Sequence, residues 1–183
     1  MKKIENVILS RKGTAILIIS AVLTAVICLI MNLFLIPAIE SAADGLRIFD
    51  MSFLYSSDSA RSFLQALSAE GKNLYLYRQL PLDFFYPVCY GCFFIFAFVK
   101  LQKKLNAFAL LPTALAVFDY AENTSIELML RSSGFSSVLA VFGSAFTSVK
   151  TVLMYGAFVF LIVFAVQSVL RKKKNKSNSA VNV

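Results

Sequence analysis

Four long apolar stretches fill most of this 183-residue chain and limit what it can fold into. They cover residues 14–36, 80–101, 107–130 and 139–170. A helix crosses a hydrocarbon core of about 30 Å with roughly 20 apolar residues, so each stretch is long enough to span a membrane. A hydrophobic content of 58% also exceeds that of ordinary soluble domains. The sequence therefore predicts one all-α membrane domain over residues 1–170, built as a bundle of four transmembrane helices.

The loop of residues 37–79 is too long for a simple connection between the first two spans. Within it, apolar residues recur with the spacing of one helical face. These residues are Ala60, Phe63, Leu64 and Leu67. The pattern predicts a short amphipathic helix on the outer, extracytoplasmic side, with Gly71 just beyond its C-terminus. This helix either covers an internal pocket or, as the pattern favours, rests in the lipid interface.

The net charge of +8 follows from basic residues that flank the apolar stretches on one side of the membrane. They are Lys2, Lys3, Arg11, Lys12, Lys100, Lys103, Lys104, Arg171, Lys172, Lys173, Lys174 and Lys176. Lys and Arg mark cytoplasmic loops, so we expect both termini inside a bacterial plasma membrane. Residues 171–183 are expected to form a basic, disordered cytoplasmic tail. This placement favours the lipid bilayer as the partner and argues against nucleic acid, while the oligomeric state stays open.

Polar side chains lie deep within the second, third and fourth stretches. Asp119, Glu122 and Lys150 are expected nearest the membrane midplane, where a charged side chain is rare and usually functional. Helical rotation places the polar residues of each helix on a shared stripe, with Lys150 on the flank of its stripe. The candidate site residues are Asp83, Tyr86, Tyr90, Asp119, Glu122, Asn123, Glu127, Thr147 and Lys150. The stripes predict that these side chains turn inward together.

Carboxylates outnumber the single lysine in this predicted interior, and a dry interior does not hold surplus charge. We therefore expect an acidic pocket that opens to the outer side and binds a small ligand, a cation or a proton. A divalent cation such as Mg²⁺ or Ca²⁺ suits clustered carboxylates. The alternative is a structural or assembly subunit whose polar network holds the helices in register. The chain contains no histidine, and this favours a role without catalysis.

Cys89 and Cys92 form a C-x-x-C in the second stretch and offer a competing function. Membrane thiol oxidoreductases that reduce quinone use such a pair in a comparable bundle. Helical angles place the two thiols away from Asp83, however, and a free cysteine packs readily as a small apolar side chain. The sequence favours apolar packing for both cysteines.

Two segments resemble a pattern in small uncharacterised bacterial four-span membrane proteins. One runs D-x-x-[FY]-P-x-x-Y-G, from Asp83 to Gly91, and the other is the D-x-x-E-N of residues 119–123. The resemblance continues to further positions in the loop and the fourth stretch. These are Tyr55, Leu67, Gly71, Lys72, Tyr75, Leu80, Pro81, Thr147 and Lys150. The resemblance implies the four-span architecture and interest in these positions, but it transfers no reaction.

Overall fold

A computed structural model describes the backbone of residues 2–181 and the side chains of residues 2–174. Most of its elements are α-helices. The exceptions are η1 and η3, which are π-helical, and η2 and η4, which are short 3₁₀-helices. The order is α1 (Lys2–Leu9), α2 (Arg11–Ile30), η1 (Met31–Leu35), α3 (Ile36–Ser41), η2 (Phe49–Met51), α4 (Ser57–Ala66), α5 (Ala69–Leu74), η3 (Tyr75–Gln79), α6 (Leu80–Gln102), η4 (Ala107–Ala109), α7 (Leu110–Arg131) and α8 (Ser137–Val181).

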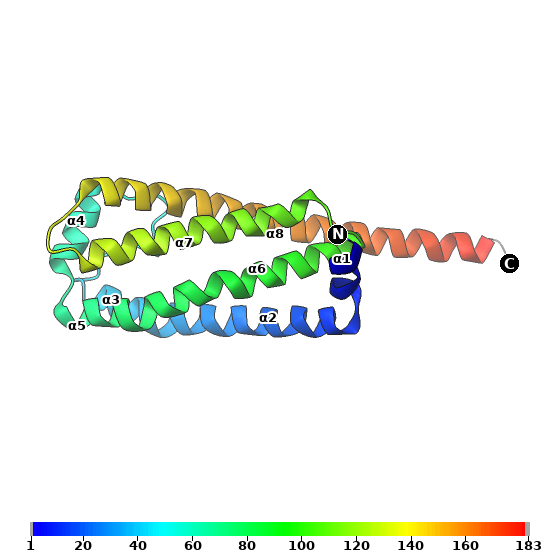
Figure 1. Ribbon diagram of the computed structural model, residues 1–183, viewed down its shortest axis with the longest axis horizontal. Coiled ribbons are helices and arrows are strands. Elements are labelled where there is room, and N and C mark those ends of the chain that lie inside the picture. The colour runs from blue at the N-terminus through cyan, green and yellow to red at the C-terminus, as the bar shows by residue number, and fades with distance from the viewer. Residues whose placement is uncertain (1, 182–183) are drawn as a thin grey trace.

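The four long helices α2, α6, α7 and α8 run along the length of the molecule (Figure 1). Helix α7 contacts both α6 and α8, and α2 packs against α6. The short helices α3, α4 and α5 gather at one end, here called the loop end. The N-terminus and the far end of α8 lie at the other, the terminal end, where α8 continues beyond its neighbours. The described chain is therefore an all-helical bundle, as the sequence predicts.

Three helical stretches of the described chain are long and apolar enough to cross a membrane. They are Arg11–Ser41, Ala69–Gln102 and Ser137–Lys174. The sequence predicted a fourth span over residues 107–130, but α7 does not meet the same measure. The reason is that Asp119, Glu122 and Glu127 lie within nine consecutive residues of this helix. Each such charge at the centre of an isolated span costs about 2.5–3.5 kcal/mol, more than several leucines return.

Prolines explain the two π-helical segments. Each segment ends two residues before a proline, η1 before Pro37 and η3 before Pro81. Proline lacks the N–H group of a helical hydrogen bond and its ring crowds the preceding turn, so a wider turn relieves the conflict. The segment η3 joins α5 to α6, and it directs Tyr75 and Gln79 into the interior, where both are 0% exposed. Wide turns of this kind are frequent at functional sites.

Helix α4 is the amphipathic helix that the sequence predicts between the first two apolar helices. Its inner face buries Ala60 and Phe63. It ends at Ala66, however, and a new helix begins at Ala69, so Gly71 lies inside α5 and not beyond the end of α4. A β-carbon at Gly71 would lie 2.6 Å from that of Ala42, so the glycine permits close packing of α5 against the end of α3.

The basic tail also differs from the prediction of disorder for residues 171–183. Helix α8 continues through the tail to Val181, and residues 182–183 lie outside the described residues. The stretch after Gly156 contains neither proline nor glycine, and its lysines are good helix formers. The side chains of residues 171–174 are exposed.

Two apolar cores divide the bundle along its length. The loop-end core includes Phe49, Phe63, Tyr75, Leu80, Ile126, Leu130 and Ala140. The terminal-end core contains Tyr90, Phe94, Phe98, Leu115, Ala157 and Phe164. Along α7 and α8, the buried side chains between these two cores are polar, and on α6 the buried Asp83 and the hydroxyl of Tyr90 add to them. The fold thus encloses a polar layer between two apolar layers.

Candidate functional site

The polar layer is formed by side chains from α6, α7 and α8. Its members are Asp83, Tyr90, Asp119, Glu122, Asn123, Thr147 and Lys150. All but Lys150 are at most 6% exposed, and the Lys150 side chain is 16% exposed. Helical spacing brings them inward, because residues three, four and seven apart share one face of a helix. The structure therefore brings together seven of the nine predicted positions.

Lys150 lies between two carboxylates of α7. Its Nζ atom is 3.5 Å from Asp119 Oδ1 and forms a closer ion pair with Glu122 Oε2. Neutral hydroxyls complete the arrangement. Tyr90 donates to Asp119 Oδ2 at 2.8 Å, and Thr147 donates to Glu122 Oε1 at 2.5 Å. One ammonium group thus pairs with two carboxylates, and each carboxylate also accepts a hydrogen bond from a hydroxyl group.

Asp83 has neutral partners. Gln79 Nε2, one turn earlier, donates to Asp83 Oδ2 at 2.8 Å. Asn123 Nδ2 on α7 donates to the Asp83 backbone oxygen at 2.9 Å, which ties α6 to α7. No basic side chain of the described residues lies within 4.0 Å of the Asp83 carboxylate. No ion pair among the described residues therefore compensates the negative charge of this buried carboxylate.

Two predicted site residues lie apart from these contacts. Tyr86 is half-buried and touches the layer through its ring, whose centroid is 5.1 Å from that of Tyr90. Glu127 pairs with Arg131 on the surface, at 2.8 Å. It lies five residues beyond Glu122, and helical rotation carries it about 140° from that side chain. Its hydrogen bond raises the pKa of the exposed Arg131 guanidinium.

The long loop and η3 contribute residues that the helical stripes did not identify. Tyr75 donates to Asp50 Oδ2 at 2.6 Å, and Asp50 Oδ1 is buried without a hydrogen-bond partner among the described residues. Gln79 was also missed, although its position four residues before Asp83 was a usable signal. Tyr55 is 8% exposed, and burial and then the negative charges of Glu122 and Asp50 raise its pKa. Asp50 and Tyr55 had no periodic signal, because they lie outside long helices.

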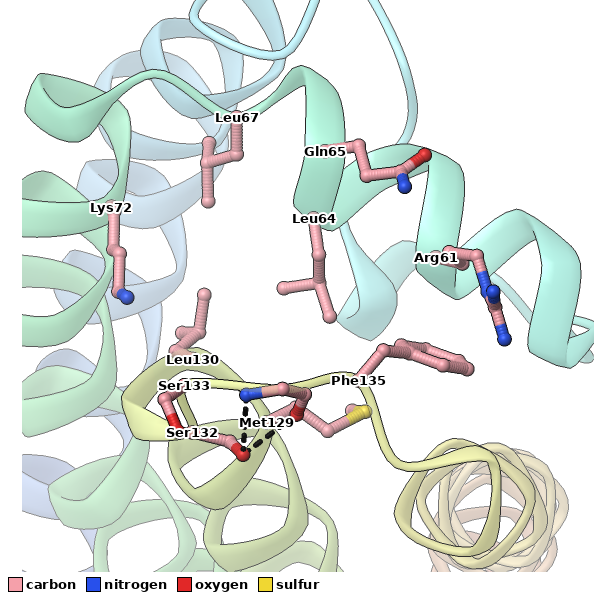
Figure 2. Close-up of a pocket in the computed structure, with 11 residues that line it drawn as sticks. Arg61, Leu64, Gln65, Leu67, Lys72, Met129, Leu130, Ser132, Ser133 and Phe135 are labelled. Carbon is pink, nitrogen blue, oxygen red and sulfur yellow. Dashed lines mark hydrogen bonds between the residues drawn. The ribbon is translucent and has the colours of Figure 1, made fainter.

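The expected acidic pocket is not an open cleft, because the carboxylates of the layer are buried. The loop end carries other pockets. One of about 290 Å³ lies between α4, α5 and the turn from α7 to α8. Figure 2 shows Leu64, Leu67 and Leu130 around it, with Lys72 and Arg61 at opposite sides. These residues are separate from the polar layer.

A second pocket at the loop end, of about 500 Å³, adjoins the layer through one residue. Tyr55 lines it together with polar side chains that include Arg47, Ser52 and Asp58. The negative charge of Glu122 raises the pKa of Tyr55, so this side chain is also near the acids of the layer. Tyr55 is therefore shared by this pocket and the surroundings of the acids.

Both cysteines of the C-x-x-C are free thiols. Cys89 and Cys92 line an apolar groove of about 170 Å³ against α2, with Ile16, Leu23 and Phe85 among their neighbours. None of the residues that contact Lys150 lines this groove. Its lining supports the interpretation of both cysteines as apolar packing residues.

The arrangement suits proton exchange better than metal binding. Among the described residues, no three His, Cys, Asp or Glu side chains form a group that could hold a metal ion. Asp119 and Glu122 instead share Lys150, and the three carboxylates accept hydrogen bonds from Tyr90, Thr147 and Gln79. A network of hydroxyls, amides and carboxylates can hold and exchange protons without further ligands.

No protein-family model, no curated protein and no solved structure matches this chain. The resemblance carried by the two sequence motifs therefore stays a prediction. The geometry of the polar layer carries the functional argument.

Proposed function

We propose that this chain is a four-span membrane protein of a bacterial plasma membrane that reversibly binds protons at its polar layer. The observation that carries this proposal is the charge balance of the layer. Among the described residues, Lys150 is the one basic side chain that pairs with an acid of the layer, and it contacts Asp119 and Glu122 but not Asp83. The protein would couple proton occupancy to a change in the bundle.

The proposal treats α7 as a fourth span that crosses in the shelter of its neighbours. Its acids Asp119 and Glu122 are buried against α6 and α8, so they do not face lipid. Its outward face carries apolar residues such as Val117, which is 60% exposed. The exposed Thr124 donates to the Tyr120 carbonyl of its own helix at 2.7 Å, which satisfies the hydroxyl without water.

The proposed orientation places the terminal end in the cytoplasm. Figure 1 shows both ends of the chain at this end of the bundle, and the basic residues of the N-terminus, the α6–η4 connection and the tail belong to it. Fluorescent reporters at either terminus should fold and fluoresce, and alkaline phosphatase inserted after Gly45 should be active outside. Activity of the two reporter types at the opposite positions would overturn this orientation.

Charge neutrality explains why protons would bind. One ammonium group balances one carboxylate, so full ionisation would leave two negative charges among these three acids. Burying an unpaired carboxylate in a low-dielectric interior costs far more than the few kcal/mol that hold a domain folded. A proton on a carboxyl group removes the charge and leaves an O–H donor.

Infrared difference spectroscopy of the purified protein in lipid nanodiscs tests proton binding. We expect a band of protonated carboxyl groups that disappears as the pH is raised. Asp83→Asn and Glu122→Gln should each remove part of this band, because each takes away a candidate proton-binding group. Glu127→Gln is the matched control on the surface of α7, and it should leave the titrating band unchanged.

The same measurement separates proton binding from a purely structural network. If the folded wild-type protein shows no titrating carboxyl band, the proton-binding proposal fails and helix locking remains. If the band is present but neither layer variant changes it, the proton resides elsewhere and the layer is not the site. Circular dichroism of each variant shows whether its helices are intact.

A further inference from the structure

Two hydroxyl groups of α8 hold the loop before α4 against the bundle. Ser144 Oγ accepts a hydrogen bond from the Tyr55 backbone N–H at 2.9 Å. One turn later, Ser148 Oγ donates to the Phe53 carbonyl. These contacts join residues about ninety positions apart in the chain, so they fix a loop segment that has no regular structure of its own.

The Tyr55 side chain enters the bundle from this segment. Its ring packs against Phe49, with the centroids 5.0 Å apart. Its hydroxyl reaches the backbone of α8 at Gly143, where an added β-carbon would lie only 2.4 Å away. The absence of a side chain at this glycine therefore makes room for the phenol. A tyrosine hydroxyl at this depth normally finds a hydrogen-bond partner.

The hydroxyl of Tyr55 is buried and forms no hydrogen bond of good geometry with the described residues. The Thr147 hydroxyl is close enough to lower the pKa of Tyr55, although burial, Glu122 and Asp50 raise it more. Lys150 also lowers this pKa. Leaving a buried donor without a partner destabilises a fold, so the position of this hydroxyl needs an explanation beyond packing.

The surroundings of this hydroxyl supply that explanation. On one side, the residue lines the 500 Å³ loop-end pocket, whose charged lining residues are Arg47 and Asp58. On the other side Thr147 donates to the fully buried Glu122. Tyr55 thus lines the pocket, while its buried hydroxyl approaches α8 at Gly143, whose carbonyl accepts a hydrogen bond from Thr147 at 3.0 Å.

We propose that Tyr55 is the proton relay between the loop-end pocket and Glu122, an inference that rests on the proposed proton binding. A small rotation of the phenol completes the series of hydrogen bonds from Tyr55 through Thr147 to Glu122. Tyr55 then passes its proton to Thr147 Oγ as Thr147 passes its own to Glu122. A proton from water in the pocket replaces the one that Tyr55 gave, so each hydroxyl loses and gains one proton. The pocket thereby becomes the outer entry to the polar layer.

Stopped-flow pH jumps on the protein in nanodiscs, followed by the protonated-carboxyl infrared band, test the relay. Tyr55→Phe keeps the ring and removes only a hydroxyl without a partner, so the bundle should fold normally. We expect the rate of proton uptake to fall roughly ten-fold or more, with the final amount of bound proton unchanged. Tyr77→Phe is the matched control, since Tyr77 is 61% exposed at the same end.

Position 147 gives a second test of the same chain. Thr147→Val should slow uptake as Tyr55→Phe does, whereas Thr147→Ser keeps a hydroxyl and should retain the wild-type rate. If wild type takes up no proton, the proposed function itself fails. If wild type takes up protons and Tyr55→Phe does so at the same rate, only the relay is refuted. The relay would also be refuted if Tyr55→Phe changed the final amount of bound proton but left the rate of uptake unchanged.

Discussion

Replacing Lys150 by methionine removes the charge from the polar layer while keeping a long apolar side chain. In the structure, the ammonium group contacts Asp119 and Glu122, and the Glu122 side chain is 0% exposed. In the variant these carboxylates keep neutral donors, Tyr90 and Thr147 respectively. The variant therefore leaves buried negative charge with no positive partner, and the folded state must either tolerate this charge or take up protons.

The size of the effect follows from two independent estimates. Removing one partner of a buried ion pair costs about 3–5 kcal/mol. Protonating a glutamate of ordinary pKa, about 4.3, costs about 3.7 kcal/mol at pH 7, since each pH unit counts for about 1.36 kcal/mol. Both values indicate that Lys150→Met lowers the free energy of unfolding by about 4 kcal/mol at neutral pH.

The stability that Lys150→Met loses relative to wild type should become smaller as the pH falls. In the folded variant a carboxyl group holds a proton, whereas in the unfolded chain the same group stays ionised above about pH 4.3. The folded state then binds more protons than the unfolded state, so lower pH favours folding of the variant. Between about pH 7 and pH 5 the deficit relative to wild type should fall by up to about 2.7 kcal/mol for one such proton.

Reversible unfolding in mixed detergent micelles, followed by circular dichroism, measures this loss at both pH values. Glu122→Gln in the Lys150→Met background should recover part of the stability, because it removes one unpaired carboxylate. Arg131→Met breaks an exposed ion pair with Glu127 and should be indistinguishable from wild type. A Lys150→Met variant that is as stable as wild type at neutral pH, or equally destabilised at both pH values, would refute the reasoning.

Two further predictions concern α8 and the thiols. Gly143→Ala should lower stability by about 1–3 kcal/mol, because its β-carbon would lie 2.4 Å from the Tyr55 hydroxyl. Gly156→Ala should raise stability by about 0.5–1 kcal/mol, because its β-carbon would meet no atom within 4 Å. Thermal unfolding of the matched pair checks the sign of each change. Alkylation followed by mass spectrometry should give the same mass with and without reductant, since Cys89 and Cys92 are free thiols in an apolar groove. A reductant-dependent shift at this pair would instead support the oxidoreductase hypothesis.

Helical periodicity was enough to predict the core of the polar layer. Asp119, Glu122 and Asn123 share one face of α7, and their shared burial follows from that spacing. Lys150 lies on the flank of its stripe, yet it reaches the acids because its long stem bends toward them. The prediction for Glu127 was wrong, because this residue lies about 140° around the helix from Glu122 and pairs with Arg131 on the surface.

Residues outside regular helices could not be placed in this way. Asp50 and Tyr55 approach the layer from a loop whose path depends on contacts with α8 almost a hundred residues away. Gln79, at the end of the π-helical turn η3, is the exception, because its position four residues before Asp83 was a usable signal. The sequence also overestimated the number of helices that are apolar enough to span a membrane by themselves. Length alone suggested four, but the acids of α7 lower its apolarity.

The weak apolarity of α7 and the polar layer have a common cause. The acids that keep α7 from qualifying as a span by itself are the acids that contact Lys150. Helix α7 contacts both α6 and α8, and these contacts cover its charged face. In the proposed four-span arrangement, the free energy that inserts this helix comes from bundling, so the polar layer and the assembled fold are coupled. A change in the charge of the layer will consequently change how firmly α7 is held between its neighbours.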